Sequence, residues 1–238
     1  MSKEKKTFLS VITLAVLCIL LIPVRSFAAD IDYPSKTGIF IGQTEIEAEK
    51  YYKISDDGTI SEIPDSGEDN YNVYLTGDAV SPILTLKDAK IPGTIQVTSG
   101  STIILSGNNT QGSEGDVVST GIEVEGTTEK EMALHITGTG SLTQWVTTEG
   151  INCTTTDKKT LLIDGGVINI HNQQSAPIIG DGDVVIGGNA KIEAANDPNT
   201  TNTISALISR GDFYVKENAT LTIDSNGGGI SSDGKYSS

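Results

Sequence analysis

Residues 133–143 read ALHITGTGSLT, which is two short apolar strands joined by a turn rich in glycine. The same arrangement returns as TLLIDGGVI at 160–168, DVVIGGNAKI at 183–192 and DFYVKENATL at 212–221. The first strands of the four segments end at Ile136, Ile163, Ile186 and Val215. Successive members of this set are 27, 23 and 29 positions apart. A unit that recurs every ~20 to 50 residues predicts a solenoid, in which successive units stack on one another.

Each unit also has a second and a third apolar strand at a nearly constant position. The second strand contains Leu142, Ile168, Ile192 or Leu221, and the third begins at Gly121-Ile122, Gly150-Ile151, Pro177-Ile178, Leu207-Ile208 or Gly229-Ile230. Glycine and asparagine accept a positive φ at low cost, so we expect them at the corner between the first and second strands. The corner residues are Gly138, Gly140, Gly165, Gly166, Asn189 and Asn218.

Three short strands in each unit of 23–29 residues predict an all-β fold, a right-handed parallel β-helix. No segment after residue 28 has apolar residues at sustained helical spacing, so little helix is expected. Alternate side chains of each strand should point into a narrow core. The residues expected to point inward are Leu134, Ile136, Leu161, Ile163, Val184, Ile186, Phe213 and Val215. A β-sandwich, which also has short strands and turns, is the alternative fold.

The first 28 residues have the features of a signal peptide. A basic start precedes an apolar stretch from Phe8 to Val24, and the small residues of Ser26-Phe27-Ala28 follow. We therefore predict cleavage before Ala29. The alternative is an uncleaved membrane anchor, because the apolar stretch nearly reaches the length of a membrane span.

The mature chain divides into two parts. Residues 29–70 are acidic and lack the repeated unit, so we expect them to cap the open apolar end of the solenoid. Residues 71–238 form the predicted repeat domain. The sequence stops shortly after a coil begins at Gly229-Ile230, so we expect either an incomplete last coil or a chain that is a fragment of a longer protein.

Charge and cysteine content limit the class of partner. The chain has 16 Lys and Arg against 31 Asp and Glu, a net charge of −15; residues 1–28 hold four basic residues and one acid, so cleavage leaves −18. Such an acidic chain has few cations to spare for phosphate, which excludes nucleic acid as a partner. Only Cys153 remains after cleavage, so no disulfide forms within the mature chain. We expect a secreted, extracellular or cell-surface bacterial protein without a membrane partner in its mature form.

Several motifs resemble those of a known family. They are HITGTGSLT at 135–143, Glu149-Gly150-Ile151 and LIDGGVINI at 162–170, with opening coils in 83–105. About residues 70–235 thus resemble exported bacterial carbohydrate-binding-domain proteins, which are non-catalytic parallel β-helices of the pectate-lyase-like type. The resemblance implies binding of plant cell-wall or related polysaccharides, with calcium held in acidic corners. The family has an acid before the Gly-Ile of several coils, whereas here Glu149 is acidic and Thr120 and Gly228 are not.

Two acids begin equivalent strands in neighbouring units. Asp183 and Asp212 should lie one above the other on the outside, where two carboxylates repel unless a cation or solvent screens them. Together with Asp181 they form the predicted calcium site, completed by carbonyl oxygens of the corner. The alternative is that all three are ordinary solvated acids.

Sugar rings lie on aromatic faces, and the repeat domain has few aromatic residues. Trp145, the only Trp, is expected in a loop beyond the second strand of its unit, where no core requires it. Trp145 and Tyr214 are the predicted ligand-binding residues, and the alternative for Trp145 is that it covers the core. The net charge of the mature chain favours a neutral polysaccharide, because an acidic one would be repelled.

Catalysis has weaker support in the sequence. Lyases with the resembling fold use Arg or Lys beside calcium as the base, and the candidates here are Arg210, Lys158, Lys159, Lys191 and Lys216. None belongs to a recognisable catalytic motif, so no catalytic residue is predicted. The sequence predicts a non-catalytic polysaccharide-binding protein; the alternatives are an adhesive or structural protein that contacts another protein, and a polysaccharide lyase or hydrolase. It specifies neither the sugar nor an oligomeric state.

Overall fold

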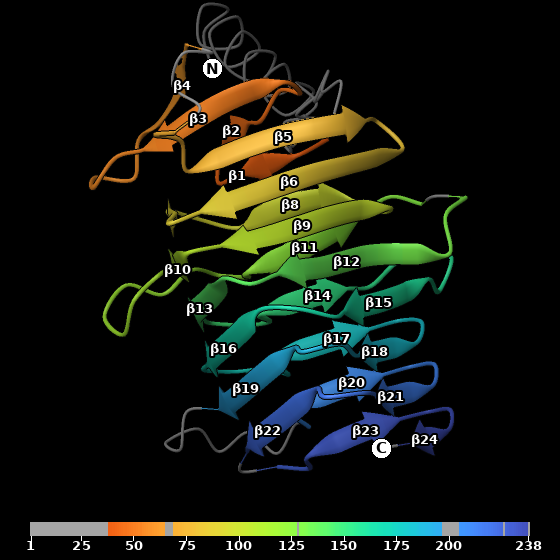
Figure 1. The fold of residues 1–238 in the computed structure, drawn as a ribbon. Coiled ribbons are helices and arrows are strands. Elements are labelled where there is room, and N and C mark those ends of the chain that lie inside the picture. Colours follow the sequence, from red (N-terminus) through yellow and green to blue (C-terminus); the bar gives the residue numbers. More distant parts are fainter. Residues whose placement is uncertain (1–37, 65–68, 128, 197–204, 226, 238) are drawn as a thin grey trace, which may run out of the picture. The chain divides into compact units, whose positions relative to one another are not determined.

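The computed structural model describes residues 38–237 apart from 65–68, 128, 197–204 and 226, and every element in these residues is a β-strand. The strands form three sheets, which we name A, B and C and which the chain visits in this order in each repeat (Figure 1). The predicted signal peptide, residues 1–28, and its cleavage site lie outside the described residues.

Within the described residues, sheets A, B and C contain eight, ten and six strands. In spatial order, sheet A consists of β2 (Thr44–Glu45), β1 (Phe40–Ile41), β8 (Ile95–Thr98), β11 (Ile122–Glu125), β14 (Ile151–Cys153), β17 (Ile178–Gly180), β20 (Leu207–Ser209) and β23 (Ile230–Ser232). Sheet B consists of β4 (Ile60–Ile63), β3 (Lys50–Ile54), β5 (Val73–Asp78), β6 (Ser81–Lys87), β9 (Ser101–Ser106), β12 (Met132–Gly138), β15 (Thr160–Ile163), β18 (Val184–Ile186), β21 (Phe213–Val215) and β24 (Tyr236–Ser237). Sheet C consists of β7 (Lys90–Ile91), β10 (Asn108–Gln111), β13 (Ser141–Val146), β16 (Val167–Asn172), β19 (Lys191–Asn196) and β22 (Thr220–Asp224).

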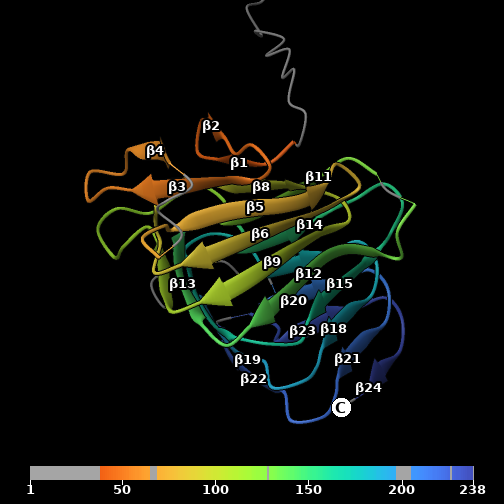
Figure 2. The same ribbon diagram turned by 45° about the horizontal axis from the view of Figure 1, so that its top comes forward.

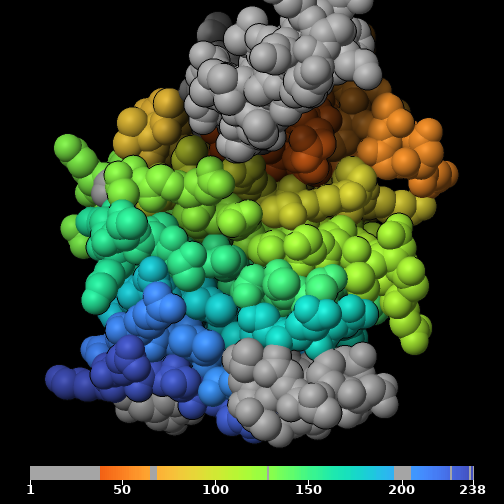
Figure 3. Space-filling model, turned by 180° about the vertical axis from the view of Figure 1, so that it is seen from behind, coloured from red at the N-terminus to blue at the C-terminus, as the bar shows by residue number. Residues whose placement is uncertain are grey.

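Successive repeats stack as parallel strands, which confirms the predicted parallel β-helix. In sheet B, Ile136 pairs with Ile163, and Ile163 pairs in turn with Ile186. Sheet C keeps the same register, with Leu142 beside Ile168. The solenoid has about five turns of ~27 residues each, and Figure 3 shows them as successive bands of colour.

Antiparallel strands lie at the N-terminal end of two sheets. β1 pairs antiparallel with β8 in sheet A, and β5 pairs antiparallel with β6 in sheet B (Figure 2). β3 lies beyond β5 and forms a hairpin with β4. Ile39, Ile41 and Ile46 are fully buried, so this region contributes apolar side chains to the core of the solenoid.

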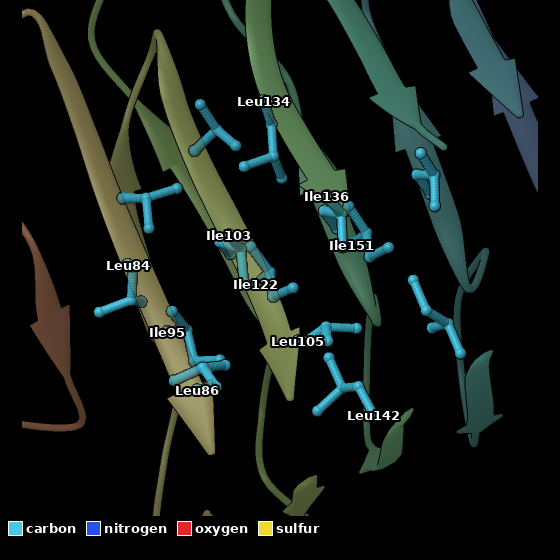
Figure 4. Packing of buried hydrophobic residues seen from close by; sticks show 14 of the residues in the cluster. Leu84, Leu86, Ile95, Ile103, Leu105, Ile122, Leu134, Ile136, Leu142 and Ile151 are labelled. Carbon is cyan, nitrogen blue, oxygen red and sulfur yellow. The ribbon is translucent and has the colours of Figure 1, made fainter. Parts of the chain in front are cut away.

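The core lies between the three sheets and consists of columns of aliphatic side chains (Figure 4). Of the eight residues predicted to point inward, seven are fully buried: Leu134, Ile136, Leu161, Ile163, Val184, Ile186 and Phe213. The eighth, Val215, is half-buried. The next coil does not cover it among the described residues, because β24 pairs with Phe213 and Tyr214 only.

The predicted register is wrong by one residue in one strand of sheet A. The sequence pattern places Ile208 beside Ile178, whereas the structure pairs Leu207 with Ile178 on one side and with Ile230 on the other. Leu207 is consequently buried, and Ile208 points outward and is half-buried. A shift of one residue exchanges the two faces of a strand, and here an aliphatic residue stands on each face.

The corner between sheets B and C has one residue with positive φ in each of four successive units. In the first three units this residue is Gly138, Gly166 or Gly188, and in the fourth it is Glu217, with a φ of 60°. The expectation that Asn189 and Asn218 adopt this conformation is wrong, because the left-handed residue comes one position earlier. Glu217 has a Cβ, so its backbone conformation costs about 1–2 kcal/mol.

Candidate functional site

Trp145 lies within strand β13, so the prediction that it lies in a loop is wrong. The strand is longer than the repeat indicates, because β13 pairs with β16 over six residues. Its side chains alternate, and Leu142, Gln144 and Val146 are buried. Trp145 therefore points to the outer face of sheet C, where it is half-buried.

His171 of β16 stacks on Trp145 across the sheet. The two rings are parallel to within 19°, and their centroids are 4.7 Å apart. His171 is exposed, and it is absent from the residues predicted to bind a ligand. A signal was nevertheless present in the sequence. Trp145 follows the inward residue Leu142 by three positions, as His171 follows Ile168.

Polar side chains accompany this aromatic pair on the outer face of sheet C. The neighbouring column, two residues away on each strand, consists of Thr110, Thr143, Asn169, Glu193 and Thr222. Hydroxyl and amide groups can both donate and accept hydrogen bonds. The face therefore offers an aromatic surface beside a row of hydrogen-bonding groups.

A cleft of about 800 Å³ lies one strand away from Trp145, at the corner between sheets C and A. Its lining comes from the turns 42–43 and 55–58, the corner 90–94 and the stretch 110–119. A Cβ on Gly112, which lines the cleft, would lie 2.7 Å from the carbonyl oxygen of Trp145. Gly112, at the edge of the cleft, therefore lies directly beside the backbone of Trp145.

The loop beside the cleft is attached to the strand that carries Trp145. The amide of Val118 donates to the carbonyl oxygen of Trp145 at 3.0 Å, and the amide of Thr147 donates to that of Val118 at 2.8 Å. Residues 113–116 are exposed, and Figure 1 shows this loop projecting near β10 and β13. The loop therefore forms one side of the cleft, and its hydrogen bonds to Trp145 and Thr147 fix its position relative to β13.

Two buried glutamines support the same corner from inside. Gln144 Nε2 donates to Gln111 Oε1 at 2.8 Å. Gln111 Nε2 in turn donates to the carbonyl oxygens of Gly93 and Gly121, at 2.6 and 2.7 Å. These bonds connect strands of sheet C to the segments that begin sheet A, and one of the acceptors, Gly93, lines the cleft.

The cleft carries charges of both signs. Lys90 Nζ lies 2.5 Å from Asp56 Oδ1, and this hydrogen bond lowers the pKa of Asp56. Asp57 accepts hydrogen bonds from Ser55 Oγ and from the amide of Thr59, which lower its pKa to about 2. Both carboxylates are therefore ionised at neutral pH.

Tyr214, the second predicted ligand-binding residue, lies on a different sheet from Trp145. It belongs to β21 of sheet B, whereas Trp145 belongs to sheet C. Its hydroxyl donates to Asp212 Oδ2 at 2.6 Å, which raises the pKa of Tyr214, and Lys216 Nζ lies 4.5 Å from the ring centre. The structure does not bring the two predicted ligand-binding residues together.

The three predicted calcium ligands lie at the corner between sheets A and B. Asp183 Oδ1 accepts a hydrogen bond from the amide of Asp212 at 2.7 Å, and Asp212 Oδ1 accepts one from the amide of Lys235 at 2.6 Å. Asp181 Oδ1 pairs with Arg210 Nη1 at 2.5 Å. Each stacked carboxylate thus has a backbone donor from the next coil, which offsets part of the expected repulsion.

The basic residues considered for catalysis are spread over the surface. Arg210 and Lys216 contact Asp181 and Tyr214, and Lys191 lies in β19 of sheet C. Within the described part of the chain, none of these residues lines the cleft, and neither does Lys158 or Lys159. Among the same residues, no three His, Cys, Asp or Glu side chains are grouped so that they could hold a metal ion.

A second aromatic cluster lies on sheet B near the N-terminal strands and was not predicted. Tyr51 and Tyr74 stack with their centroids 4.3 Å apart, and Tyr71 lies 5.2 Å from Tyr51. Lys87 Nζ lies 4.9 Å from the ring centre of Tyr71. Tyr51 and Tyr74 meet because β3 and β5 pair antiparallel, outside the parallel repeat that the sequence pattern reveals.

The described residues contain no helix that is long and apolar enough to cross a membrane. No family model, curated protein or solved structure matches this chain.

Proposed function

We propose that this protein binds a neutral polysaccharide without catalysing a reaction on it, outside the cell or at the cell surface. The observation that carries the proposal is the stack of Trp145 and His171 on the outer face of sheet C. The apolar face of a pyranose ring packs well on an aromatic ring, while the hydroxyls at its rim need hydrogen-bond partners. Thr143 and Asn169 lie on the same outer face and supply such groups.

The surroundings of the stack suit an extended sugar chain. Parallel strands repeat at about 4.8 Å, so equivalent side chains of successive coils form rows across the sheet. In one direction the row leads from Trp145 to Gly112, where the cleft begins. A glycan that lies across the coils would therefore contact the aromatic stack and the cleft together.

The charge of the protein supports a neutral ligand. The mature chain has a net charge of −18, and Asp56 and Asp57 place two ionised carboxylates in the cleft. These groups would repel an acidic polymer. A neutral glucan or mannan avoids this repulsion and can accept and donate hydrogen bonds along its whole length.

Replacing Trp145 by Ala is expected to weaken binding to a neutral glucan or mannan by about tenfold or more, because the stacking surface is lost. The residue lies outside the core, so unfolding should become easier by no more than about 1.5 kcal/mol. Affinity electrophoresis in gels that contain each polysaccharide measures the binding, and thermal unfolding measures the stability.

Tyr214→Ala is the matched control, since it removes an aromatic ring from the outer face of sheet B. A site on sheet C predicts unchanged binding in this variant, whereas loss of binding in Tyr214→Ala alone would support the predicted role of Tyr214 and contradict a site on sheet C. Loss of stability without loss of binding in Trp145→Ala would show that Trp145 only covers the core. Equal loss of binding in both variants would contradict a site on sheet C.

Calcium binding by Asp181, Asp183 and Asp212 stays a prediction. A cation at this corner would have to compete with Arg210 for Asp181. Adding calcium should raise the melting temperature, because a ligand that binds only the folded state stabilises it, and Asp212→Asn should remove the rise. An unchanged midpoint in the wild-type protein would show that these carboxylates bind only solvent, Arg210, Tyr214 and backbone donors.

A further inference from the structure

The outer face of sheet B carries a continuous row of uncharged side chains. Alternate residues of a strand point outward, and the register places one outward residue of each strand beside that of the next. On the seven strands from β5 to β21 these residues are Thr76, Ile83, Thr102, His135, Leu162, Val185 and Tyr214, which we name the sheet B stripe. None of them is Asp, Glu, Lys or Arg.

Part of sheet B is apolar on both of its faces. Leu161-Leu162-Ile163 in β15 and Val184-Val185-Ile186 in β18 are unbroken aliphatic runs. Such runs are typical of parallel strands that are covered on both sides. Leu162 and Val185 are only half-buried, and Figure 1 shows no other described element in front of β6, β9 and β12. Within the described residues, the outer face of sheet B therefore lacks the cover that its sequence pattern indicates.

Large apolar side chains are also exposed along one edge of this face. Among the described residues these side chains are Val80, Met132 and Val167, and the first two adjoin sheet B. Val80 lies in the turn before β6, and Met132 is the first residue of β12, so both are at the edge where the strands begin. Apolar residues with few charges among them are typical of the centre of a protein–protein interface. The face therefore has the composition of an interface.

Charged residues lie at the two ends of the strands, where an interface has its rim. In three coils the start and the end of the strand carry opposite charges. These residues are Asp78 and Lys87 for β6, Lys159 and Asp164 for β15, and Asp212 and Lys216 for β21. Asp78 belongs to the start of β6 because it pairs with Ser81 across the hairpin. A second copy turned by half a turn about the solenoid axis would place every strand start opposite a strand end, so each of these charges would meet the opposite sign.

The same charges exclude the other symmetric arrangement of two copies. If the two solenoid axes ran in opposite directions, strand starts would face strand starts, and β6 would face β21. Asp78 would then meet Asp212, and Lys87 would meet Lys216. Charges at the rim of an interface direct its register, and like charges that face each other are unfavourable. The two axes should therefore run in the same direction.

The size of the face sets the expected affinity. Seven strands about 4.8 Å apart and four residues of about 3.3 Å each give a face of about 30 by 13 Å. Two copies would bury about 800 Å² before the corners are counted, which is below the ~1,200–2,000 Å² of stable complexes. The net charge of −18 adds repulsion, which salt at ~0.15 M screens beyond about 8 Å. We therefore expect a weak, reversible association.

We propose that the outer face of sheet B binds the same face of a second copy of this chain, with the two solenoid axes in the same direction. The sheet B stripes of the two copies form the centre of the interface, and the charges at the strand ends form its rim. The inference goes beyond the proposed polysaccharide binding and does not depend on it, because the Trp145–His171 stack lies on sheet C.

Sedimentation velocity of the mature protein at about 0.15 M salt, from about 1 μM to about 1 mM protein, tests the association. The sedimentation coefficient should rise with concentration from that of a monomer to that of a dimer. Leu162→Asp should weaken the dimer about tenfold or more, because its carboxylate would lose solvent against the second copy. At the lowest concentration the monomer prevails, so unfolding and polysaccharide binding measured there do not depend on the dimer.

Val167→Asp is the matched control, since it places the same carboxyl group on an exposed apolar position of sheet C. It should dimerise as the wild type does, and circular dichroism should show both variants folded. Trp145→Ala should also dimerise normally, whether or not Trp145 binds a sugar. A protein that stays monomeric up to the highest concentration, or equal dimerisation of Leu162→Asp and the wild type, would overturn the proposal. Weaker polysaccharide binding by monomeric Leu162→Asp, without any dimer in the wild type, would overturn it in favour of a glycan on sheet B.

Cross-linking tests the direction of the axes. Ile83 lies near one end of the sheet B stripe and Tyr214 at the other. A short bis-maleimide should therefore join two copies of Ile83→Cys to each other, while the native Cys153 is buried and should not react. Cross-linking of Ile83→Cys only to Tyr214→Cys, in a mixture of the two variants, would contradict axes that run in the same direction.

Discussion

Replacing Ile163 by Asp is expected to unfold the solenoid. Ile163 is fully buried in the middle of sheet B, between Ile136 of the preceding coil and Ile186 of the following one. Its burial contributes about 1.5–3 kcal/mol, and a carboxyl group in the same column has no partner, which costs several kcal/mol more. The sum is comparable with the ~5–15 kcal/mol that stabilises a typical domain. Circular dichroism and urea unfolding measure the loss.

Leu162→Asp is the matched control for this variant. Leu162 is the adjacent residue of the same strand, but it points outward and is half-buried, so the same carboxyl group would reach solvent. We expect this variant to unfold cooperatively with a midpoint close to that of the wild type. A soluble, cooperative Ile163→Asp variant, or equal damage from both substitutions, would count against the assignment of the inward columns.

Replacing Gly138 by Ala should have the second largest effect on stability. Gly138 forms the corner between β12 and β13 with a φ of 111°, and a Cβ there would lie 2.2 Å from the carbonyl oxygen of Leu105 and 2.8 Å from its nitrogen. Both neighbours are backbone atoms of the adjacent coil, so they cannot move without disturbing the stack. We expect a loss of about 2–5 kcal/mol, from the left-handed conformation and the overpacking together, in urea unfolding.

Gly42→Ala separates these two causes. Gly42 also has a positive φ, of 58°, but nothing lies within 4 Å of the position of its Cβ. This variant should lose only about 1–2 kcal/mol, which is the cost of the backbone conformation alone. If Gly138→Ala and Gly42→Ala lower the free energy of unfolding by the same amount, the close approach of the coils at Gly138 does not contribute to the loss.

The repeat made the fold predictable because a solenoid uses the same local chemistry in every coil. Ile136, Ile163 and Ile186 stand at corresponding positions of successive units, and the structure pairs them directly. The position of an inward column follows from strand alternation and from a turn at a constant offset, and both can be read along the chain. No contact between distant segments had to be known in advance.

The errors in the sequence prediction arose where the local pattern was compatible with two registers or with two strand lengths. Leu207 and Ile208 are both aliphatic, so alternation alone did not decide which one faces inward. Trp145 lies at the end of a six-residue strand, whereas the repeat indicated a shorter one. The structure settles both cases through pairing with a neighbouring coil, at Ile178 and at His171 respectively.

By itself, the sequence determined the parallel coils and most of their inward residues, because stacking similar units requires only regular spacing. Only the tertiary structure decided which outward side chains meet. Trp145 and His171 are 26 residues apart in the chain and come into contact through the register of β13 and β16. Such features depend on the register between coils and on the paths of loops, which a repeated apolar pattern does not encode.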